Sequence, residues 1–353
     1  MKISDISTPA LLLFEKTFTS NREKMKELVS GTGVSLRPHY KSHKCARIAH
    51  AQISDGAIGM TCAKLDEAID LVDSGIEDVL IANQIVDRAK ISRLASLARA
   101  ARITVCVDDD KNILDIEKAA ATAASTVYCL VEYEIGMERC GVRRKEDVLR
   151  LAALIESCPH LVFDGIQAYA GHIAHEESIE KRKSETEKNA KKIKEVISYL
   201  SQKGIEVRVI SGASTGTSQL KVAEGLYTEL QAGSYLFMDS TYRALGLPFE
   251  NSLFILTTVV SVNERMVIVD AGVKSCGVDQ GTPVPFGFNA ERVEACEEHF
   301  QIYSPDKKFA VGDKVMLIPA HCCSTVNLHD RIYLVDGEKV IDRYDVTARG
   351  GFH

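Results

Sequence analysis

The sequence predicts an α/β fold, a (β/α)₈ TIM barrel, with an all-β domain at its C-terminal end. Two observations indicate the barrel: eight short β-type runs follow one another between residues 35 and 237, and segments with helical spacing separate them. A third observation indicates the second domain. Beyond about residue 247 only strand-like runs remain, and turn residues divide them.

The eight runs differ in length but share an apolar, strand-like character. In chain order they are 35–40, 57–62, 78–83, 103–108, 127–133, 163–170, 206–211 and 228–237. Helical spacing is clearest in 64–75, 89–101 and 184–204, where Gly75 and Gly204 are typical of helix ends. An open doubly wound sheet is the alternative. It usually has a Gly-rich turn after its first strand, where this chain has a lysine and histidine cluster.

The C-terminal region contains four strand-like runs, 253–262, 265–272, 313–321 and 331–346, and we expect no helix between them. The apolar run 8–14 near the N-terminus is a further candidate strand for this domain. The sequence therefore predicts a barrel over 21–247 and a β-domain over 1–20 and 248–353, with no internal repeat.

Composition excludes several classes of partner. The net charge is −6, and 43 basic and 49 acidic residues are mixed along the chain without a basic stripe, so we expect no nucleic-acid partner. The N-terminal apolar run is too short for a signal sequence or a membrane span. Ten cysteines without a CxxC pair indicate reduced thiols, and we expect a cytoplasmic protein with no membrane partner.

Polar residues gather where the expected strands end, which is where barrel enzymes carry their chemistry. The first strand ends in PHYKSHK (38–44), the fifth in VEYEIGMERCGV (131–142) and the sixth in QAYAGHIAH (167–175). SGASTGTS (211–218) and LQAGSYLF (230–237) supply hydroxyls and free backbone N–H groups, which suit a phosphate. A lysine opposite a phosphate cradle suggests Schiff-base chemistry with pyridoxal phosphate.

Together these motifs carry a resemblance. LRPHYKSHKC, VEYEIGMERCGV, IQAYAGHIAH, SGASTGTS and YTELQAGSYLFMD, followed by VDAGVKS, EEHF, IPAHCCSTVNLHD and DVTARG, resemble the D-threonine aldolase family. The match runs in order over nearly the whole chain. It implies an alanine-racemase-like, fold-type III architecture, in which a pyridoxal-phosphate barrel is joined to a β-domain.

The resemblance also implies roles for individual residues. Lys41 is the Schiff-base lysine, and His175 is the base acting on the substrate β-hydroxyl, with His172 as its alternative. The side chains of His39 and His43 either shape the surroundings of Lys41 or are structural. The cofactor-binding residues implied are Lys41, Arg139 at the phenolate oxygen, Tyr169 beside the ring, and Thr215, Gly216, Thr217, Gly233, Ser234 and Tyr235 at the phosphate. His321 and Cys323 are the implied ligands of a divalent metal.

Cys323 departs from the pattern of the aldolases, in which the second metal ligand is usually aspartate. A His-x-Cys pair looks more like the related D-serine and 3-hydroxyaspartate dehydratases. Thiolate is softer than carboxylate, so the preference among Mn²⁺, Mg²⁺ and Zn²⁺ should move toward Zn²⁺. With two protein ligands, water and substrate would complete an open catalytic site.

The leading hypothesis is a lyase that cleaves D-3-hydroxy-amino acids, of the D-threonine or 3-hydroxyaspartate type, to glycine and an aldehyde. A metal-assisted dehydratase that gives a 2-oxo acid and ammonia is the alternative. A non-catalytic protein of pyridoxal-phosphate homeostasis is a third hypothesis, but such a carrier needs neither the β-domain nor the His321/Cys323 pair. A racemase is weaker, because Tyr303 and Tyr333 lie in no motif of the expected kind. The resemblance further implies a homodimer.

Overall fold

The computed structural model describes all 353 residues, Met1–His353. The chain divides into two compact units. The β unit comprises 1–25, 42–48 and 234–350, and the barrel unit comprises 26–41, 49–233 and 351–353. The domain boundaries expected from the sequence stay a prediction.

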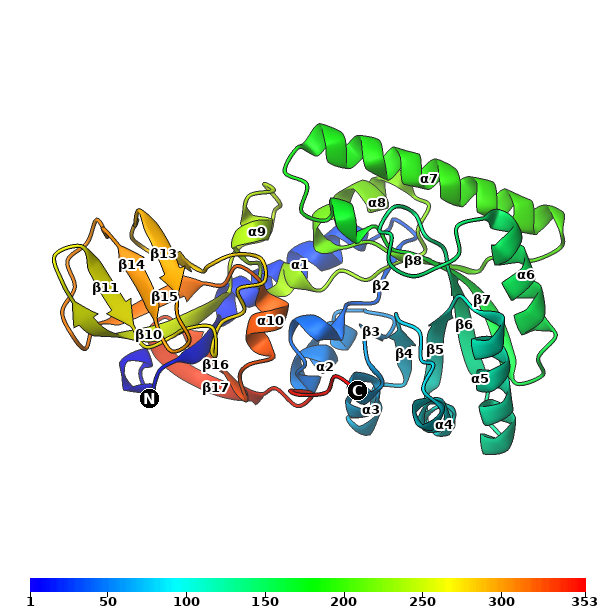
Figure 1. The fold of residues 1–353 in the computed structure, drawn as a ribbon, viewed down its shortest axis with the longest axis horizontal. Coiled ribbons are helices and arrows are strands. Elements are labelled where there is room, and N and C mark those ends of the chain that lie inside the picture. Colours follow the sequence, from blue (N-terminus) through cyan, green and yellow to red (C-terminus); the bar gives the residue numbers. More distant parts are fainter. The chain divides into compact units, whose positions relative to one another are not determined.

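The barrel unit contains one parallel sheet with the strand order β2-β9-β8-β7-β6-β5-β4-β3 (Figure 1). A parallel bridge between His39 and Thr61 joins the first strand of this order to the last, so the sheet closes. All eight strands expected in this region are present. They are β2 (Ser35–Leu36), β3 (Met60–Cys62), β4 (Asp78–Ile81), β5 (Arg102–Val107), β6 (Val127–Glu132), β7 (Leu161–Ala168), β8 (Val209–Gly212) and β9 (Glu229–Leu230).

Helices follow the strands and cover the outside of the barrel (Figure 1). The three expected helices are present as α3, α4 and α7. Helix α7 begins five residues earlier than expected, because Ser178 caps its first turn by accepting a hydrogen bond from the Lys181 amide. Gly75 and Gly204 lie just beyond α3 and α7 with φ of +93° and +81°, a conformation that favours glycine. The helices are α3 (Leu65–Asp73), α4 (Arg88–Leu97), α5 (Asp110–Ala123), α6 (Lys145–Glu156), α7 (Ile179–Gln202) and α8 (Ser218–Glu224). Two more, α1 (Glu15–Val29) and α2 (Ala46–Ser54), run across the unit boundary.

The β unit is a mainly antiparallel sheet with the order β13-β14-β11-β10-β1-β16-β17, and β15 pairs with β10 and β12. As expected, the N-terminal run adds a strand: Ala10 pairs with Leu256 and Leu11 with Ile332, which places β1 between β10 and β16. The strands are β1 (Ala10–Phe14), β10 (Leu253–Val262), β11 (Met266–Val269), β12 (Val284–Pro285), β13 (Arg292–Ala295), β14 (Phe300–Tyr303), β15 (Lys314–Ile318), β16 (Arg331–Asp336) and β17 (Lys339–Asp345). EEHF spans the turn of the β13–β14 hairpin and the first residue of β14, Phe300.

The expectation of no helix beyond residue 247 is wrong at α10 (Cys322–Val326). This helix is too short to show a hydrophobic period in the sequence. Asp239, which lies far from α10 in the sequence, holds the first turn of this helix. Its carboxylate accepts a hydrogen bond from the Cys322 amide at 3.2 Å. Asp239 also caps α9 (Ser240–Arg243) by accepting from the Tyr242 amide.

A buried cation holds the seam where the barrel closes. Arg37 directly follows β2, and its Nε lies 2.9 Å from Oε2 of Glu229, while its Nη1 lies 2.6 Å from Oδ1 of Asp78. The side chains of Arg37 and Glu229 are 8% and 3% exposed, so neither charge has water as a substitute partner. Carboxylates from β4 and β9 therefore converge on one guanidinium that extends from the end of β2.

We expect Arg37→Met to lower the free energy of unfolding by about 3–5 kcal/mol, because Glu229 would remain as a buried charge without its partner. Chemical denaturation checks this value. Arg93→Met is the control, since Arg93 pairs with Asp66 at 3.1 Å but is 51% exposed, and such pairs contribute about 0–1 kcal/mol. Equal losses in both variants would contradict the assignment of Arg37 as the seam residue.

Candidate active site

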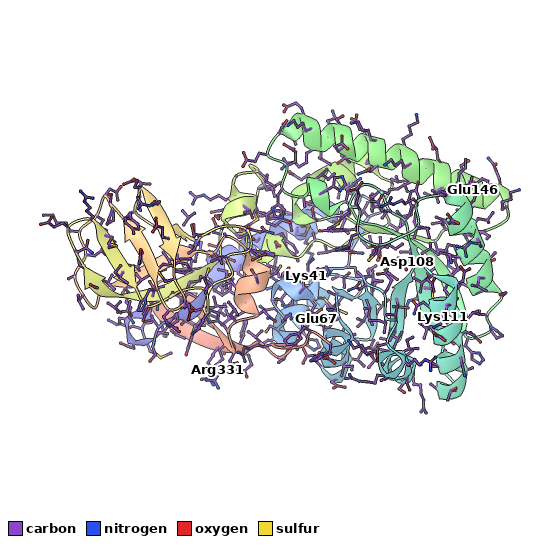
Figure 2. All side chains as sticks on the ribbon, viewed as in Figure 1. Lys41, Glu67, Asp108, Lys111, Glu146 and Arg331 are labelled. Carbon is purple, nitrogen blue, oxygen red and sulfur yellow. The ribbon has the colours of Figure 1, made fainter.

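The PHYKSHK segment forms a tight turn at the carboxyl end of β2. Lys41 lies half-buried in the 3₁₀ turn η2 (Tyr40–Ser42), after the strand end (Figure 2). His39 accepts a hydrogen bond from the Lys41 amide through Nδ1 at 3.4 Å, and His43 accepts one from the Cys45 amide at 3.2 Å. Both histidines therefore order the local backbone, which makes them part of the turn that presents Lys41.

The C-terminal half of the segment belongs to the β unit. Nζ of Lys44 donates to Oδ1 of Asn327 at 2.8 Å, and the carbonyl of Lys44 accepts from the Ala348 amide at 3.1 Å. Ser42 is buried, and its Oγ lies 3.8 Å from Sγ of Cys323. The residue directly after Lys41 thus contacts one of the two expected metal ligands.

Arg139 and Tyr169 lie side by side in the barrel unit, on the loops that follow β6 and β7. The guanidinium carbon of Arg139 is 6.0 Å from the centre of the Tyr169 ring, and its Nη2 is 3.8 Å from Oε1 of Glu132. Asp108, which follows β5, accepts a hydrogen bond from the Gly141 amide at 2.8 Å and so holds the loop that carries Arg139 (Figure 2). An arginine and an aromatic ring are thereby placed together at one end of the barrel.

Glu132 is a residue that the sequence reasoning missed. It is buried at the end of β6, where Nε2 of Gln84 donates to its Oε2 at 2.5 Å. Burial raises the pKa of this carboxyl, although the Gln84 hydrogen bond and the positive charge of Arg139 act in the opposite direction. The only signal in the sequence is an acidic residue that ends an otherwise apolar strand.

The segment expected to bind phosphate forms the 3₁₀ turn η4 (Thr215–Thr217), which runs directly into α8. Thr215, Gly216 and Thr217 are all buried. Oγ1 of Thr217 accepts from the Ser214 amide at 3.1 Å, and Oγ of Ser218 donates to the carbonyl of Thr215 at 2.9 Å. The first amides of a helix lack partners within the helix, so this turn offers the donors that an anion requires.

The second expected phosphate segment lies on the unit boundary. Gly233 ends a stretch of the barrel unit, and Ser234 and Tyr235 begin the 3₁₀ turn η5 (Ser234–Leu236) of the β unit. All three residues are buried. The Tyr235 ring packs 5.8 Å from the Phe249 ring, and the Met238 amide donates to the Ser234 carbonyl at 2.7 Å.

The two candidate bases of the AYAGHIAH motif have different surroundings. His172 is exposed, and its ring lies against Gly136, where an added Cβ would come within 2.8 Å of the imidazole. His175 is half-buried beyond the 3₁₀ turn η3 (Gly171–Ile173). A packed ring is better suited to hold a proton at a fixed position, which favours His175 as the base.

The His321 and Cys323 side chains face each other in the β unit. A hydrogen bond with Cys323 and another with Asp279 raise the pKa of His321 to about 9, although desolvation by burial acts in the opposite direction. Nδ1 of His321 lies 2.6 Å from Oδ2 of Asp279, which sequence reasoning missed. The chain brings together no group of three or more His, Cys, Asp or Glu side chains suited to a metal ion, and the His321/Cys323 metal pair stays a prediction.

Unusual backbone conformations cluster near the expected site residues. Six residues other than glycine have a positive φ, and four of them lie within three positions of a residue expected in the site. Such conformations cost free energy and persist where the surroundings require them, often at functional sites. The four are Lys44, Glu138, Ala213 and Met238.

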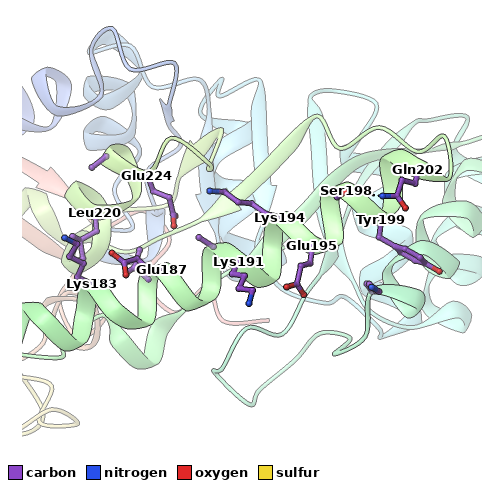
Figure 3. A pocket seen from close by; sticks show the side chains of 14 residues that line it. Lys183, Glu187, Lys191, Lys194, Glu195, Ser198, Tyr199, Gln202, Leu220 and Glu224 are labelled. Atoms are coloured by element: carbon purple, nitrogen blue, oxygen red, sulfur yellow. Dashed lines mark hydrogen bonds between the residues drawn. The ribbon is translucent and has the colours of Figure 1, made fainter.

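A wide pocket on the barrel unit does not contain these residues. It has a volume of about 960 Å³ and lies among α6, α7 and α8, on the outside of the barrel (Figure 3). Lysine and glutamate side chains of α7, such as Lys191 and Glu187, line much of it. The expected site is therefore identified from the chemistry of its side chains, and not from the size of a pocket.

The parallel barrel with a lysine at a strand end, together with the antiparallel sheet, is the architecture of the alanine racemase fold class. Residues 15–241 match the family described as alanine racemase, N-terminal domain, and residues 252–335 match the putative serine dehydratase domain. The crystal structure of D-threonine aldolase from Filomicrobium marinum superposes with a TM-score of 0.96 at 37% identity, covering 99% of this chain and 97% of that one.

Relatives by sequence agree with this match. 3-Hydroxy-D-aspartate aldolase from Paracoccus denitrificans (strain Pd 1222) is 38% identical, and D-threonine aldolase from Arthrobacter sp. is 37% identical. Each alignment covers 99% of this chain and 94% of the relative. The chain belongs to the D-threonine aldolase family. A more distant relative, at 25% identity over 91% of this chain and 92% of its own length, is D-threo-3-hydroxyaspartate dehydratase from Delftia sp. (strain HT23).

No helix has both the length and the apolar character that crossing a membrane requires.

His329, close to α10, should make the free energy of unfolding depend on pH. Its Nε2 lies 2.7 Å from the carbonyl oxygen of Ser275, and burial lowers the pKa of His329. In the unfolded chain the His329 imidazole takes up a proton near pH 6.5, whereas in the folded chain it does so only at lower pH. We therefore expect the free energy of unfolding to fall as pH drops below about 6.5, and His329→Gln to reduce that slope. Denaturation at several pH values checks this, and an unchanged slope would refute it.

Proposed function

We propose that this chain is a lyase dependent on pyridoxal phosphate and a divalent metal. It cleaves D-3-hydroxy-amino acids of the D-threonine or 3-hydroxyaspartate type to glycine and an aldehyde. The observation that carries the proposal is the packing of Cys323 against Ser42, the residue after Lys41. Ser42 and Lys41 belong to the same 3₁₀ turn, so an expected metal ligand contacts the turn that carries the lysine expected to bind the cofactor.

The residues of the barrel unit fit pyridoxal phosphate. Lys41 offers an amine for covalent attachment, Arg139 a hydrogen-bond donor for the phenolate oxygen, and Tyr169 a ring beside the pyridine. The buried turn Thr215–Thr217 offers amides and hydroxyls to the phosphate, and Gly233, Ser234 and Tyr235 are the second phosphate segment. When bound, the cofactor supplies an electron sink for the bond broken at the substrate α-carbon.

The residues of the β unit fit a divalent metal. Nε2 of His321 and the thiolate of Cys323 are the two donors, and a thiolate favours Zn²⁺ more than a carboxylate would. The metal supplies Lewis-acid polarisation of the substrate β-hydroxyl. The proposed base, His175, accepts the β-hydroxyl proton as the bond between the α-carbon and β-carbon breaks. Return of a proton to the α-carbon completes glycine, and the β-carbon leaves as the aldehyde.

A dehydratase is the second candidate, and Cys323 is the observation that favours it. In that reaction the substrate loses its α-proton and its β-hydroxyl as water, the resulting enamine becomes an imine, and a second water hydrolyses the imine to a 2-oxo acid and ammonia. Lys41 is the proposed base for the α-proton. The similarity to the aldolases over the whole chain favours carbon–carbon cleavage.

A product assay tests the proposal. Chelated enzyme loaded with pyridoxal phosphate is given D-threonine or the D-threo and D-erythro isomers of 3-hydroxyaspartate, with Mn²⁺, Mg²⁺ or Zn²⁺. We expect glycine and an aldehyde in equal amounts. A 2-oxo acid with ammonia and no glycine would establish the dehydratase, and cofactor binding without either product would favour the homeostasis protein.

We expect His175→Asn to lower kcat by about 10²- to 10⁴-fold, the usual contribution of a general base. The absorbance of the bound cofactor should not change, because the proposed cofactor-binding residues remain. His172→Asn is the matched control, and it should keep kcat within a few-fold of wild type. A loss of kcat in the control with normal turnover in His175→Asn would assign the base to His172.

A further inference from the structure

The carboxylate of Asp279 bridges two residues of the segment that carries the expected metal ligands. Its Oδ2 lies 2.6 Å from Nδ1 of His321, and its Oδ1 accepts a hydrogen bond from Oγ of Ser324 at 2.5 Å. The side chain of His321 is 22% exposed, so most of the imidazole is covered by neighbouring atoms. Both oxygens of Asp279 are therefore committed to α10 and its N-cap residue, His321.

The loop that carries Asp279 is held tightly against α10. The Gly277 amide donates to Oγ1 of Thr325 at 3.1 Å, and Oγ1 of Thr325 donates in turn to the carbonyl of His321 at 2.8 Å. A Cβ on Gly277 would come within 2.0 Å of Oγ of Ser324, so no larger residue fits there. The position of Asp279 relative to His321 is thus held by contacts of its loop with the Thr325 and Ser324 side chains.

This contact decides which imidazole nitrogen is free. When Nδ1 carries a proton and donates it to Asp279, Nε2 has the lone pair that a metal needs. Nδ1 and Nε2 point away from each other, so a carboxylate at Nδ1 does not bind the same ion as Nε2. Asp279 is accordingly not a third ligand. A carboxylate at this place also increases the basicity of the ring and fixes its orientation.

We propose that Asp279 is a positioning residue for metal binding: it holds His321 in the tautomer and orientation in which Nε2 coordinates a divalent cation together with Cys323. Ser324 fixes the second carboxylate oxygen and so prevents Asp279 from rotating away. This inference rests on the metal pair of the proposed function. It adds a carboxylate 42 residues before His321 to the residues that set metal affinity.

Metal binding by the full-length protein, without any turnover, provides the test. Chelated wild type, Asp279→Asn, Asp279→Ala and Ser324→Ala are titrated with Zn²⁺ against a chromophoric competitor. We expect Asp279→Ala to raise the Kd for Zn²⁺ by about 10- to 100-fold, as losses of such supporting contacts do. Asp279→Asn keeps the shape but loses the charge, and we expect a smaller rise. Ser324→Ala should raise the Kd least.

The chain offers a matched control in a second histidine–carboxylate pair. Nδ1 of His160 lies 2.8 Å from Oε1 of Glu117 in the barrel unit, away from α10 in the sequence. Glu117→Gln removes a pair of similar geometry, and we expect its Kd for Zn²⁺ to equal that of wild type. A rise in this control as large as in Asp279→Asn would overturn the inference, because general destabilisation would then explain the effect.

Absorption of bound Co²⁺ gives a second readout. A thiolate-to-metal band reports on Cys323, and we expect Asp279→Asn to show this band at saturation with a weaker affinity. If wild type binds no Zn²⁺, the metal pair of the proposed function fails and the inference fails with it. If wild type binds and Asp279→Asn binds equally well, the inference alone is overturned. Asp279→Asn decides the question even if Asp279→Ala does not fold.

Discussion

The closure of the barrel by the buried Arg37 is the constraint on which the position of the lysine depends. Arg37 joins Glu229 and Asp78, and its carbonyl accepts from Oγ1 of Thr61 at 2.8 Å, so β2 is fixed to strands on both sides of the seam. Lys41 follows four residues later, in a turn ordered by histidine side chains. A shift of the seam would therefore move the Lys41 side chain.

Carboxylates hold the loops that carry the candidate site, and one of them, Asp239, is fully buried. Asp108 holds the loop of Arg139, Asp239 holds the first turn of α10, and Asp279 holds His321. Burial raises the pKa of Asp239 even though three donors surround it, which shows that desolvation exceeds the gain from those hydrogen bonds. At Asp239, therefore, a carboxylate is kept in place at a cost in desolvation, and the gain is a fixed position for the first turn of α10.

Much of the fold follows from local patterns, whereas the supports of the site do not. Runs such as 103–108 become strands because parallel barrel strands are buried on both faces, and the glycines at 75 and 204 allow the chain to leave a helix. The location of the candidate site residues at the strand ends follows from the barrel fold, which carries its chemistry there. Asp239 has a local signal only as the N-cap of α9, whereas its contact with Cys322 and the contact of Asp279 with His321 join residues at least 42 positions apart and leave no local signal. Helix α10 is missed because it is too short to show a hydrophobic period and because a residue far away in the sequence, Asp239, holds its first turn.

The central place of β1 in its sheet has a consequence for synthesis of the chain. β1 ends at Phe14 and pairs with β10, which begins at Leu253, and with β16, which begins at Arg331. A ribosome adds about 5–20 residues each second, so β1 emerges on the order of 10–50 s before its first partner. During that interval Leu11, Leu12 and Leu13 have no sheet to join, and the nascent chain exposes a strand that other chains can pair with.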